Sequence, residues 1–193
     1  FEAIKLIKKF KIFNYIQAEE KLIFVDLEKI NFELLNQFEK QKFLPIFFLF
    51  QILDEFSLKE FTFSKSEITH IKKLRKWKNK LDKKVINELN EKERFDLHKD
   101  LEMILPAFIL SLPQSFHVDW ITRWRDKDNK LFHPSNLING DVVKSYLEIQ
   151  DGPLLGKLIN YLSRELAFNR LGNFDEAIYK GKQWIKQNAP KCD

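Results

Sequence analysis

The chain has 193 residues and a formal net charge of +5, with 44% hydrophobic and 32% charged residues. This length is sufficient for one large domain or two small packed ones. Only five glycines and six prolines are present, too few for the frequent turns that a sheet protein needs. We therefore expect an all-α fold of two packed helical sub-bundles with no significant sheet. The first is a helical bundle of residues 1–112 that includes a basic helix over 64–85, and the second is a smaller helical unit of residues 116–193.

Composition also limits the compartment. The single cysteine, Cys192, excludes a disulfide within one chain and a cysteine-based metal site, so we expect a reducing compartment, the cytoplasm. The apolar run 43–52 is too short to cross a bilayer, and acidic residues follow it at once, so we expect no membrane contact. The chain starts at Phe1 rather than Met, and we expect a fragment of a longer protein.

Helical periodicity covers the first half of the chain. It predicts helices over 1–12 and 14–41, the second with a fresh start at Asn31. The most apolar helix is expected over 43–56, at the centre of the first bundle, with Pro45 tolerated in its first turn. Ser64 and Glu67 have the spacing of a capping box. The helix that they open is expected to turn these residues inward: Ile68, Ile71, Leu74, Leu81 and Val85.

The helix after Ser64 is strongly basic. Between Lys65 and Lys84 nine lysine and arginine residues stand against two carboxylates, a local excess larger than the net charge of the whole chain. The outward side carries Lys72, Lys73, Lys76, Lys80 and Lys83, flanked by His70 and Trp77. Such an asymmetry favours a polyanion partner, although lysine-rich faces are also common as plain solvated surface.

The middle of the chain is less regular. A helix pair is expected within 89–112, divided near Asp100 or running on to Pro106. A break follows around Pro113, and a helix over 116–125 carries Trp120 and Trp124 on one side. Residues 126–130 form a polar turn.

Glycines organise the terminal segment. Gly152 is expected to end one helix with a positive φ, and Pro153 to begin the next. That next helix has one apolar stripe, and Gly156 within it indicates a close backbone approach. Asn173 and Glu176 predict the N-cap of a last helix. Off the stripe, and on the same helix, lie Lys157, Asn160, Tyr161 and Arg164.

Three ordered motifs carry a resemblance: Ile138-Asn-Gly140-Asp141-Val-Val, Gly152-Pro153-Leu-Leu-Gly156-Lys-Leu and Asn173-Phe-Asp-Glu-Ala177. Together they resemble the carboxy-terminal end of bacterial tRNA nucleotidyltransferases and poly(A) polymerases, over about the last quarter of the chain. The chain departs from the family pattern twice. Asp141 follows Gly140 directly, and Glu148 or a neighbour replaces a usual glycine.

The resemblance implies that this chain is the RNA-holding part of an enzyme that adds nucleotides to RNA 3′ ends. The partners would be RNA, chiefly tRNA, and a missing amino-terminal catalytic domain that uses Mg²⁺ with CTP or ATP. The basic helix ends and faces then become RNA-binding candidates: Lys72, Lys73, Lys76, Lys80, Lys157, Arg164 and Arg170. The amide groups at the start of the helix from Pro153 would form an anion site, unless these glycines serve only a tight turn.

The chemistry of nucleotide transfer is not expected in this chain. Transfer needs clustered carboxylates that hold Mg²⁺, which the family supplies on a strand after a Gly-Gly-Ser loop. Asp126-Lys-Asp128 lies in a polar turn without such a loop, and the family's Glu-Asp-x-x-Arg pattern is missing. We therefore expect no catalytic residue, no metal site and no cofactor in this chain.

Two other functions remain open. A helical protein–protein interaction module would use an apolar patch of exposed Trp77, Trp124 and Trp184. An HD-type phosphohydrolase would require a bound metal. Enzymes of that class have adjacent His and Asp residues, whereas Lys99 separates His98 from Asp100 here.

Overall fold

The computed structural model describes residues 30–52, 62–83 and 85–188. These residues form helices and turns with no strand among them, which confirms the all-α expectation. Their contacts form two compact units. Unit 1 contains residues 30–52, 62–83 and 104–121, and unit 2 contains residues 85–103 and 122–188. The division near residues 112–116 that the sequence suggested stays a prediction.

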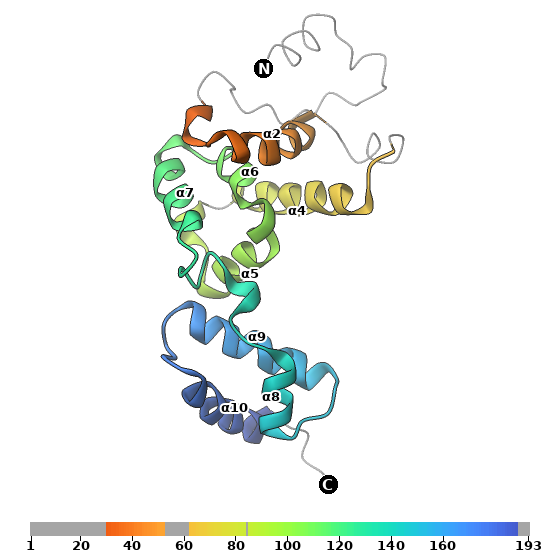
Figure 1. The fold of residues 1–193 in the computed structure, drawn as a ribbon, viewed down its shortest axis with the longest axis vertical. Helices are drawn as coiled ribbons and strands as arrows, with labels where there is room; N and C mark the ends of the chain where they lie inside the picture. The colour runs from red at the N-terminus through yellow and green to blue at the C-terminus, as the bar shows by residue number, and fades with distance from the viewer. Residues whose placement is uncertain (1–29, 53–61, 84, 189–193) are drawn as a thin grey trace, which may run out of the picture. The chain divides into compact units, whose positions relative to one another are not determined.

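Unit 1 is built around a core rich in aromatic side chains. Helix α2 packs against both α4 and α6 (Figure 1). The largest side chains that are fully buried there are those of Phe43, Phe47, Phe50, Trp77 and Phe108. The described elements of this unit are η3 (Phe32–Leu34), α2 (Gln37–Ile52), α4 (Lys65–Leu81), α6 (Leu105–Ile109), η6 (Gln114–Phe116) and the start of α7 (His117–Arg125).

Helix α2 begins earlier than expected. The Asn36 side chain accepts a bond from the Glu39 amide at 2.9 Å, and the Glu39 carboxylate accepts one from the Asn36 amide at 2.9 Å. This reciprocal cap starts the helix at Gln37, so the prediction that Pro45 lies in the first turn is wrong. Pro45 sits inside the helix and cannot donate to the carbonyl four residues before it. The helix expected over 1–12, residues 14–29 of the one expected over 14–41, and the continuation over 53–56 lie outside the described residues.

Helix α4 confirms its predicted start. The Ser64 hydroxyl accepts from the Glu67 amide at 3.2 Å, and the Glu67 carboxylate accepts from the Ser64 amide at 2.9 Å. Ile71 and Leu74 are buried as expected, but so is Trp77, which the sequence pattern placed on the flank. The inward position expected for Val85 is wrong: the helix ends at Leu81, and Val85 is 58% exposed.

Unit 2 encloses a separate aliphatic core. Helices α8, α9 and α10 pack on one another, and α5 packs against α9 (Figure 1). Its buried core is Val143, Leu155, Leu158, Leu162, Leu166, Leu171 and Ala177. The expected apolar stripe of α9 is therefore confirmed. The elements are η4 (Ile86–Glu88), α5 (Glu91–Leu101), η5 (Glu102–Ile104), the end of α7, η7 (Pro134–Asn136), α8 (Gly140–Leu147), α9 (Pro153–Ala167) and α10 (Phe174–Asn188).

His98 of α5 is a core residue of unit 2. Its ring lies 4.2 Å from the ring of Phe132, and the residue is 3% exposed. Burial lowers the pKa of His98 to about 3, with the nearby Arg123 and Arg94 charges adding to the effect. The imidazole is therefore neutral near pH 7, and its ring packs against Phe132.

The end of α8 differs from the expectation. Gly152, with φ 157°, is the N-cap residue of α9 and does not end the preceding helix. The left-handed residue that ends α8 is Glu148, with φ 53° and ψ 39°. The Ile149 amide then donates to the Lys144 carbonyl at 3.2 Å, as expected after such a cap. The structure thus places a left-handed residue where the sequence lacks the glycine that the resemblance would supply.

The close backbone approach expected at Gly156 is also wrong. Gly156 is exposed, and a Cβ atom there would meet nothing within 4 Å. The tight positions are Gly140 and Gly181. A Cβ at Gly140 would lie 2.9 Å from Ile159 Cδ1, and one at Gly181 would lie 2.9 Å from Leu147 Cδ1.

Helix α10 begins as predicted. The Asn173 side chain accepts from the Glu176 amide at 2.9 Å. The Glu176 carboxylate accepts from the Gly172 amide at 2.7 Å, one residue earlier than in a standard capping box.

Within the described residues, no single helix has both the length and the apolar character that crossing a bilayer requires. The segments Glu91–Ile109 and Gln114–Arg125 meet those criteria only as a bent pair.

Replacing Glu148 by glycine should stabilise the protein. A residue other than glycine in the left-handed region carries steric strain, which glycine lacks. After the larger unfolded-state entropy of glycine is subtracted, we expect the free energy of unfolding to rise by about 0.5–1 kcal/mol. Urea unfolding measures it. Glu148→Ala is the matched control and should give no gain; an equal gain for both variants would contradict the assignment of strain.

The two helical glycines Gly156 and Gly181 should respond in opposite directions. Gly156→Ala should raise the free energy of unfolding by about 1 kcal/mol, because alanine is the better helix former and the site is open. Gly181→Leu should lower it by about 1–3 kcal/mol by overpacking against Leu147. Thermal and urea unfolding of both variants test this pair. A lower free energy of unfolding for Gly156→Ala would contradict the open site and would support the close backbone approach that the sequence suggested.

Candidate functional site

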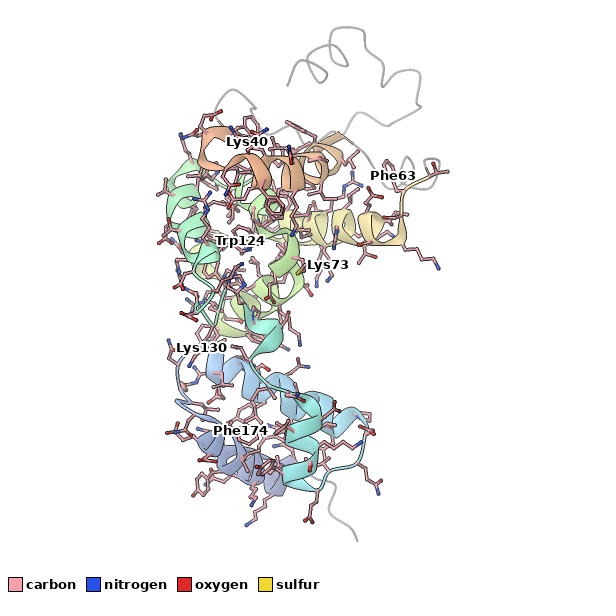
Figure 2. All side chains as sticks on the ribbon, in the orientation of Figure 1. Lys40, Phe63, Lys73, Trp124, Lys130 and Phe174 are labelled. Atoms are coloured by element: carbon pink, nitrogen blue, oxygen red, sulfur yellow. The ribbon has the colours of Figure 1, made fainter. Side chains whose placement is uncertain are left out.

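The outward side of α4 carries a shallow basic hollow, called here the α4 basic face. Its volume is about 670 Å³. The described residues that line the hollow are Thr69, Lys72, Lys73, Arg75, Lys76 and Asn79. Four of these six are cations, and none is a carboxylate. Lys73 projects from α4 on the side away from α2 (Figure 2). The hollow therefore presents positive charge and two polar side chains to whatever enters it.

The geometry of α4 explains why these lysines face outward. Ile71, Leu74 and Trp77 are each at most 1% exposed, so one stripe of the helix is committed to the core of unit 1. Residues one and two positions from each member of that stripe point away from it, because successive residues turn by about 100°. Burial of the stripe thus places Lys72, Lys73 and Lys76 together on the outer surface.

The lysines of α4 are not equivalent. The ammonium groups of Lys76 and Lys80 lie 5.2 Å and 4.8 Å from the centroid of the Trp77 ring. These two side chains cover the indole and gain a cation–π attraction there, so they also serve the fold. Lys72 is exposed and Lys73 is half-buried, and neither forms a hydrogen bond or ion pair with another described side chain. Lys72 and Lys73 are therefore the pair whose removal tests binding with least effect on packing.

His70 flanks the α4 basic face without adding charge. It is half-buried, and burial lowers its pKa, with the charge of Lys73 lowering it further. The ring is thus neutral at neutral pH and offers polar atoms or an aromatic surface rather than a cation.

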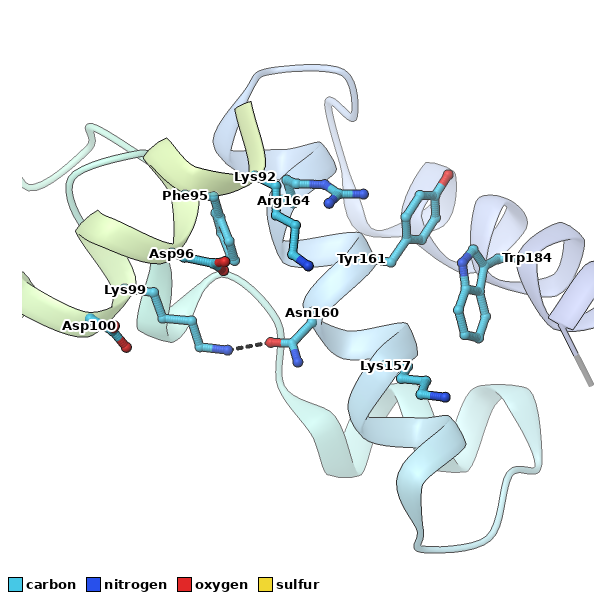
Figure 3. A pocket seen from close by; sticks show the side chains of 10 residues that line it. All are labelled: Lys92, Phe95, Asp96, Lys99, Asp100, Lys157, Asn160, Tyr161, Arg164 and Trp184. Atoms are coloured by element: carbon cyan, nitrogen blue, oxygen red, sulfur yellow. Dashed lines mark hydrogen bonds between the residues drawn. The ribbon is translucent and has the colours of Figure 1, made fainter. Parts of the chain in front are cut away.

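Lys157 and Arg164 line a second hollow, within unit 2. This α5–α9 hollow has a volume of about 500 Å³ and is formed by α5, α9 and one residue of α10 (Figure 3). It contains carboxylates as well as cations. The described lining residues are Lys92, Phe95, Asp96, Lys99, Asp100, Lys157, Asn160, Tyr161, Arg164 and Trp184. All four residues expected off the apolar stripe of α9 are therefore found together here.

Arg170 has a different role from the other predicted RNA-binding residues. Its guanidinium binds both carboxylate oxygens of Glu91, at 2.6 Å and 2.7 Å, and one oxygen of Glu165 at 2.6 Å. The pKa of Arg170 is raised by these hydrogen bonds, and the pKa of Glu91 is lowered by the same contact. Its charge is compensated inside unit 2, where it joins the start of α5 to the end of α9. We therefore leave Arg170 out of the binding surface proposed below.

The residues of the glycine motifs form caps. The Asn139 side chain accepts from the amides of Asp141 and Val142, at 3.0 Å and 3.2 Å, at the start of α8. Before α9, the Asp151 carboxylate is paired with the Lys144 ammonium beside Gly152 and Pro153. No side chain in the described part of the chain caps the amides at the start of α9. The anion-binding site expected at that helix end stays a prediction.

The expected patch of three exposed tryptophans is wrong, because Trp77 is 1% exposed. Trp124 is half-buried, and its indole N–H donates to the Glu102 carbonyl at 3.3 Å. Trp184 is half-buried and stacks on Tyr161 with ring centroids 5.9 Å apart.

Residues of α5 were missed by the sequence reasoning. Lys92 and Lys99 are seven positions apart, so they share a helix face, and the Lys99 ammonium donates to the Asn160 side chain across to α9. The spacing was a usable signal, but nothing in the sequence indicated that α5 packs beside a helix about sixty residues later. In the described ranges, no group of three or more His, Cys, Asp or Glu side chains is arranged to hold a metal ion.

The chain matches no protein-family model, and comparisons with curated proteins and with solved structures find no significant match.

Replacing Arg170 by methionine should lower stability and leave RNA binding unchanged. The change removes the shared partner of Glu91 and of the mostly buried Glu165, so we expect a loss on the order of 1–2 kcal/mol in the free energy of unfolding. Urea unfolding measures the loss, and anisotropy with a labelled tRNA measures binding. Lys186→Met, at an exposed position of α10, is the control and should change stability little. Unchanged stability together with weakened RNA binding would mean that Arg170 binds RNA and does not stabilise unit 2.

Proposed function

We propose that this chain binds the phosphate backbone of a folded, tRNA-like RNA through the α4 basic face. The observation that supports this most is the composition of that surface: four cations and no carboxylate among its described lining residues. A polyanion is the partner that such a surface attracts, and nucleic-acid backbones are the commonest polyanions with regularly spaced charges.

Backbone recognition suits the residues present. Lysine acts as a flexible point charge, whereas reading base edges uses planar, bidentate groups such as arginine. The face contains one arginine beside three lysines, with Thr69 and Asn79 as neutral donors. Structured RNA is held largely through its shape, its phosphates and its 2′-hydroxyl groups. We therefore expect weak discrimination among sequences and a strong dependence on salt.

The three ordered motifs near the end of this chain support the proposal that it is part of a larger enzyme. We take it as the RNA-holding body and tail of a cytoplasmic protein similar to tRNA nucleotidyltransferases and poly(A) polymerases. A separate amino-terminal domain would then supply Mg²⁺, the nucleotide CTP or ATP, and the chemistry of transfer. The residues of this chain would hold the RNA while its 3′ end reaches that domain.

A protein–protein interaction module is the competing function, and salt separates the two. Release of condensed counterions makes RNA affinity fall steeply with salt, whereas association of apolar surfaces does not weaken in this way.

Replacing Lys72 and Lys73 by glutamine should weaken binding to tRNA and flatten its salt dependence. Each lost phosphate contact reduces the log–log salt slope by roughly 0.9 on a duplex, so we expect a change of up to about two units. Glutamine keeps a helix propensity close to that of lysine, and neither position is in the core. Fluorescence anisotropy with a labelled tRNA across a salt series measures both quantities.

The matched control is Lys182→Gln with Lys186→Gln, which removes the same charge from two exposed positions of α10. This control should retain the wild-type slope. An unchanged slope in the α4 variant, or the same change in both, would mean that the α4 lysines are only a solvated surface.

A further inference from the structure

The α5–α9 hollow of unit 2 combines features that the α4 basic face lacks. Its four α9 residues lie between the side chains of α5 on one side and Trp184 of α10 on the other (Figure 3). The volume of about 500 Å³ falls within the range of roughly 300–1,000 Å³ seen for small-ligand sites. We propose that this hollow binds one unpaired nucleotide. Its base would lie against Tyr161 and Trp184, and its phosphate would be bound by Lys157 of α9 and by Lys92 and Lys99 of α5.

The aromatic side of the hollow supports a base. The Tyr161 and Trp184 rings are stacked, 5.9 Å apart with an interplanar angle of 23°. Both are half-buried and both line the hollow, so they are held in a fixed orientation while part of each remains open to it. A preformed aromatic stack is a surface on which a nucleobase continues the stacking, and any base has the flat face that this requires.

The opposite side supports a phosphate. Lys92 and Lys99 of α5 line the hollow together with Lys157 and Arg164 of α9, and the Lys99 ammonium donates to the Asn160 side chain (Figure 3). The Arg164 Nε atom lies 3.9 Å from a Glu91 oxygen and has no hydrogen-bond partner among the described residues. All four cations line one hollow of about 500 Å³, a volume that suits a single phosphate group better than an extended backbone.

Two carboxylates further restrict the class of ligand that the hollow can bind. Asp96 and Asp100 also line the hollow, so its four cations exceed its anions by only two. A long polyphosphate or an acidic peptide would meet these carboxylates with repulsion and would leave the aromatic side unused. A nucleotide has one or two charges for the lysines, hydroxyl or amino hydrogens for the carboxylates, and a base for the rings.

The inference extends the proposed RNA binding to an unpaired nucleotide, but it depends on different residues. The α4 basic face lies in unit 1, and the hollow lies in unit 2. A free mononucleotide and an unpaired position of an RNA strand share the same chemistry, so the test includes both.

The test uses the Lys72→Gln/Lys73→Gln protein, so that the α4 basic face contributes little. A labelled tetranucleotide of adenosine is compared by anisotropy with an abasic tetranucleotide of the same charge, and AMP is added as a competitor. Trp184→Leu should weaken the adenosine strand about ten-fold and leave the abasic strand unchanged, since only the first has bases to stack. Lys157→Gln should weaken both strands and flatten the salt slope by about 0.7.

Lys157 is exposed, so its replacement tests the site even if Trp184→Leu lowers stability. Displacement of the strand by AMP would identify a free-nucleotide site; binding of the strand without such displacement would identify an RNA strand as the ligand. Equal binding of the adenosine and abasic strands, or equal binding of a glutamate peptide, would overturn the inference. So would a folded Lys157→Gln protein with wild-type affinity. The parallel tRNA measurement on the α4 variant alone is unaffected by any of these results.

Discussion

Burial of one stripe of α4 is the constraint on which the proposed binding surface depends. Ile71, Leu74 and Trp77 are almost completely removed from solvent in the core of unit 1. Since the helical period fixes every other residue relative to that stripe, the lysines between its members must face outward. The ammonium groups of Lys76 and Lys80 then lie over the Trp77 ring, where they gain a cation–π attraction. The same packing that stabilises unit 1 thus concentrates positive charge on its surface.

Charged side chains have two roles in unit 2. Arg170 is bound by Glu91 and Glu165 and fixes the start of α5 beside the end of α9. With these helix ends joined, the remaining cations of α5 and α9 line the α5–α9 hollow. A sequence count treats Arg170 and Lys157 alike, and both are exposed, but Arg170 is bound to two carboxylates whereas Lys157 lines the hollow.

Local rules predicted much of the fold, and contacts between distant residues were the part that failed. The Ser64 and Asn173 caps and the stripe of α9 are patterns within a few residues, and all three are present. Trp77 was placed outward because lysines surround it, although its spacing from Leu74 equals that of Leu74 from Ile71. The partner of Arg170 lies 79 positions away, and no local pattern encodes such a pair. The left-handed turn at Glu148 was missed because that conformation usually selects glycine.

Lysine reactivity with and without tRNA tests the central claim most directly. Each exposed ammonium group is acetylated at a rate that mass spectrometry follows residue by residue, and a bound phosphate slows that rate. The account predicts that tRNA protects Lys72 and Lys73 at low salt, that added salt removes the protection, and that Lys182 and Lys186 react at the same rate throughout. Unchanged reactivity of Lys72 and Lys73 at saturating tRNA would contradict it.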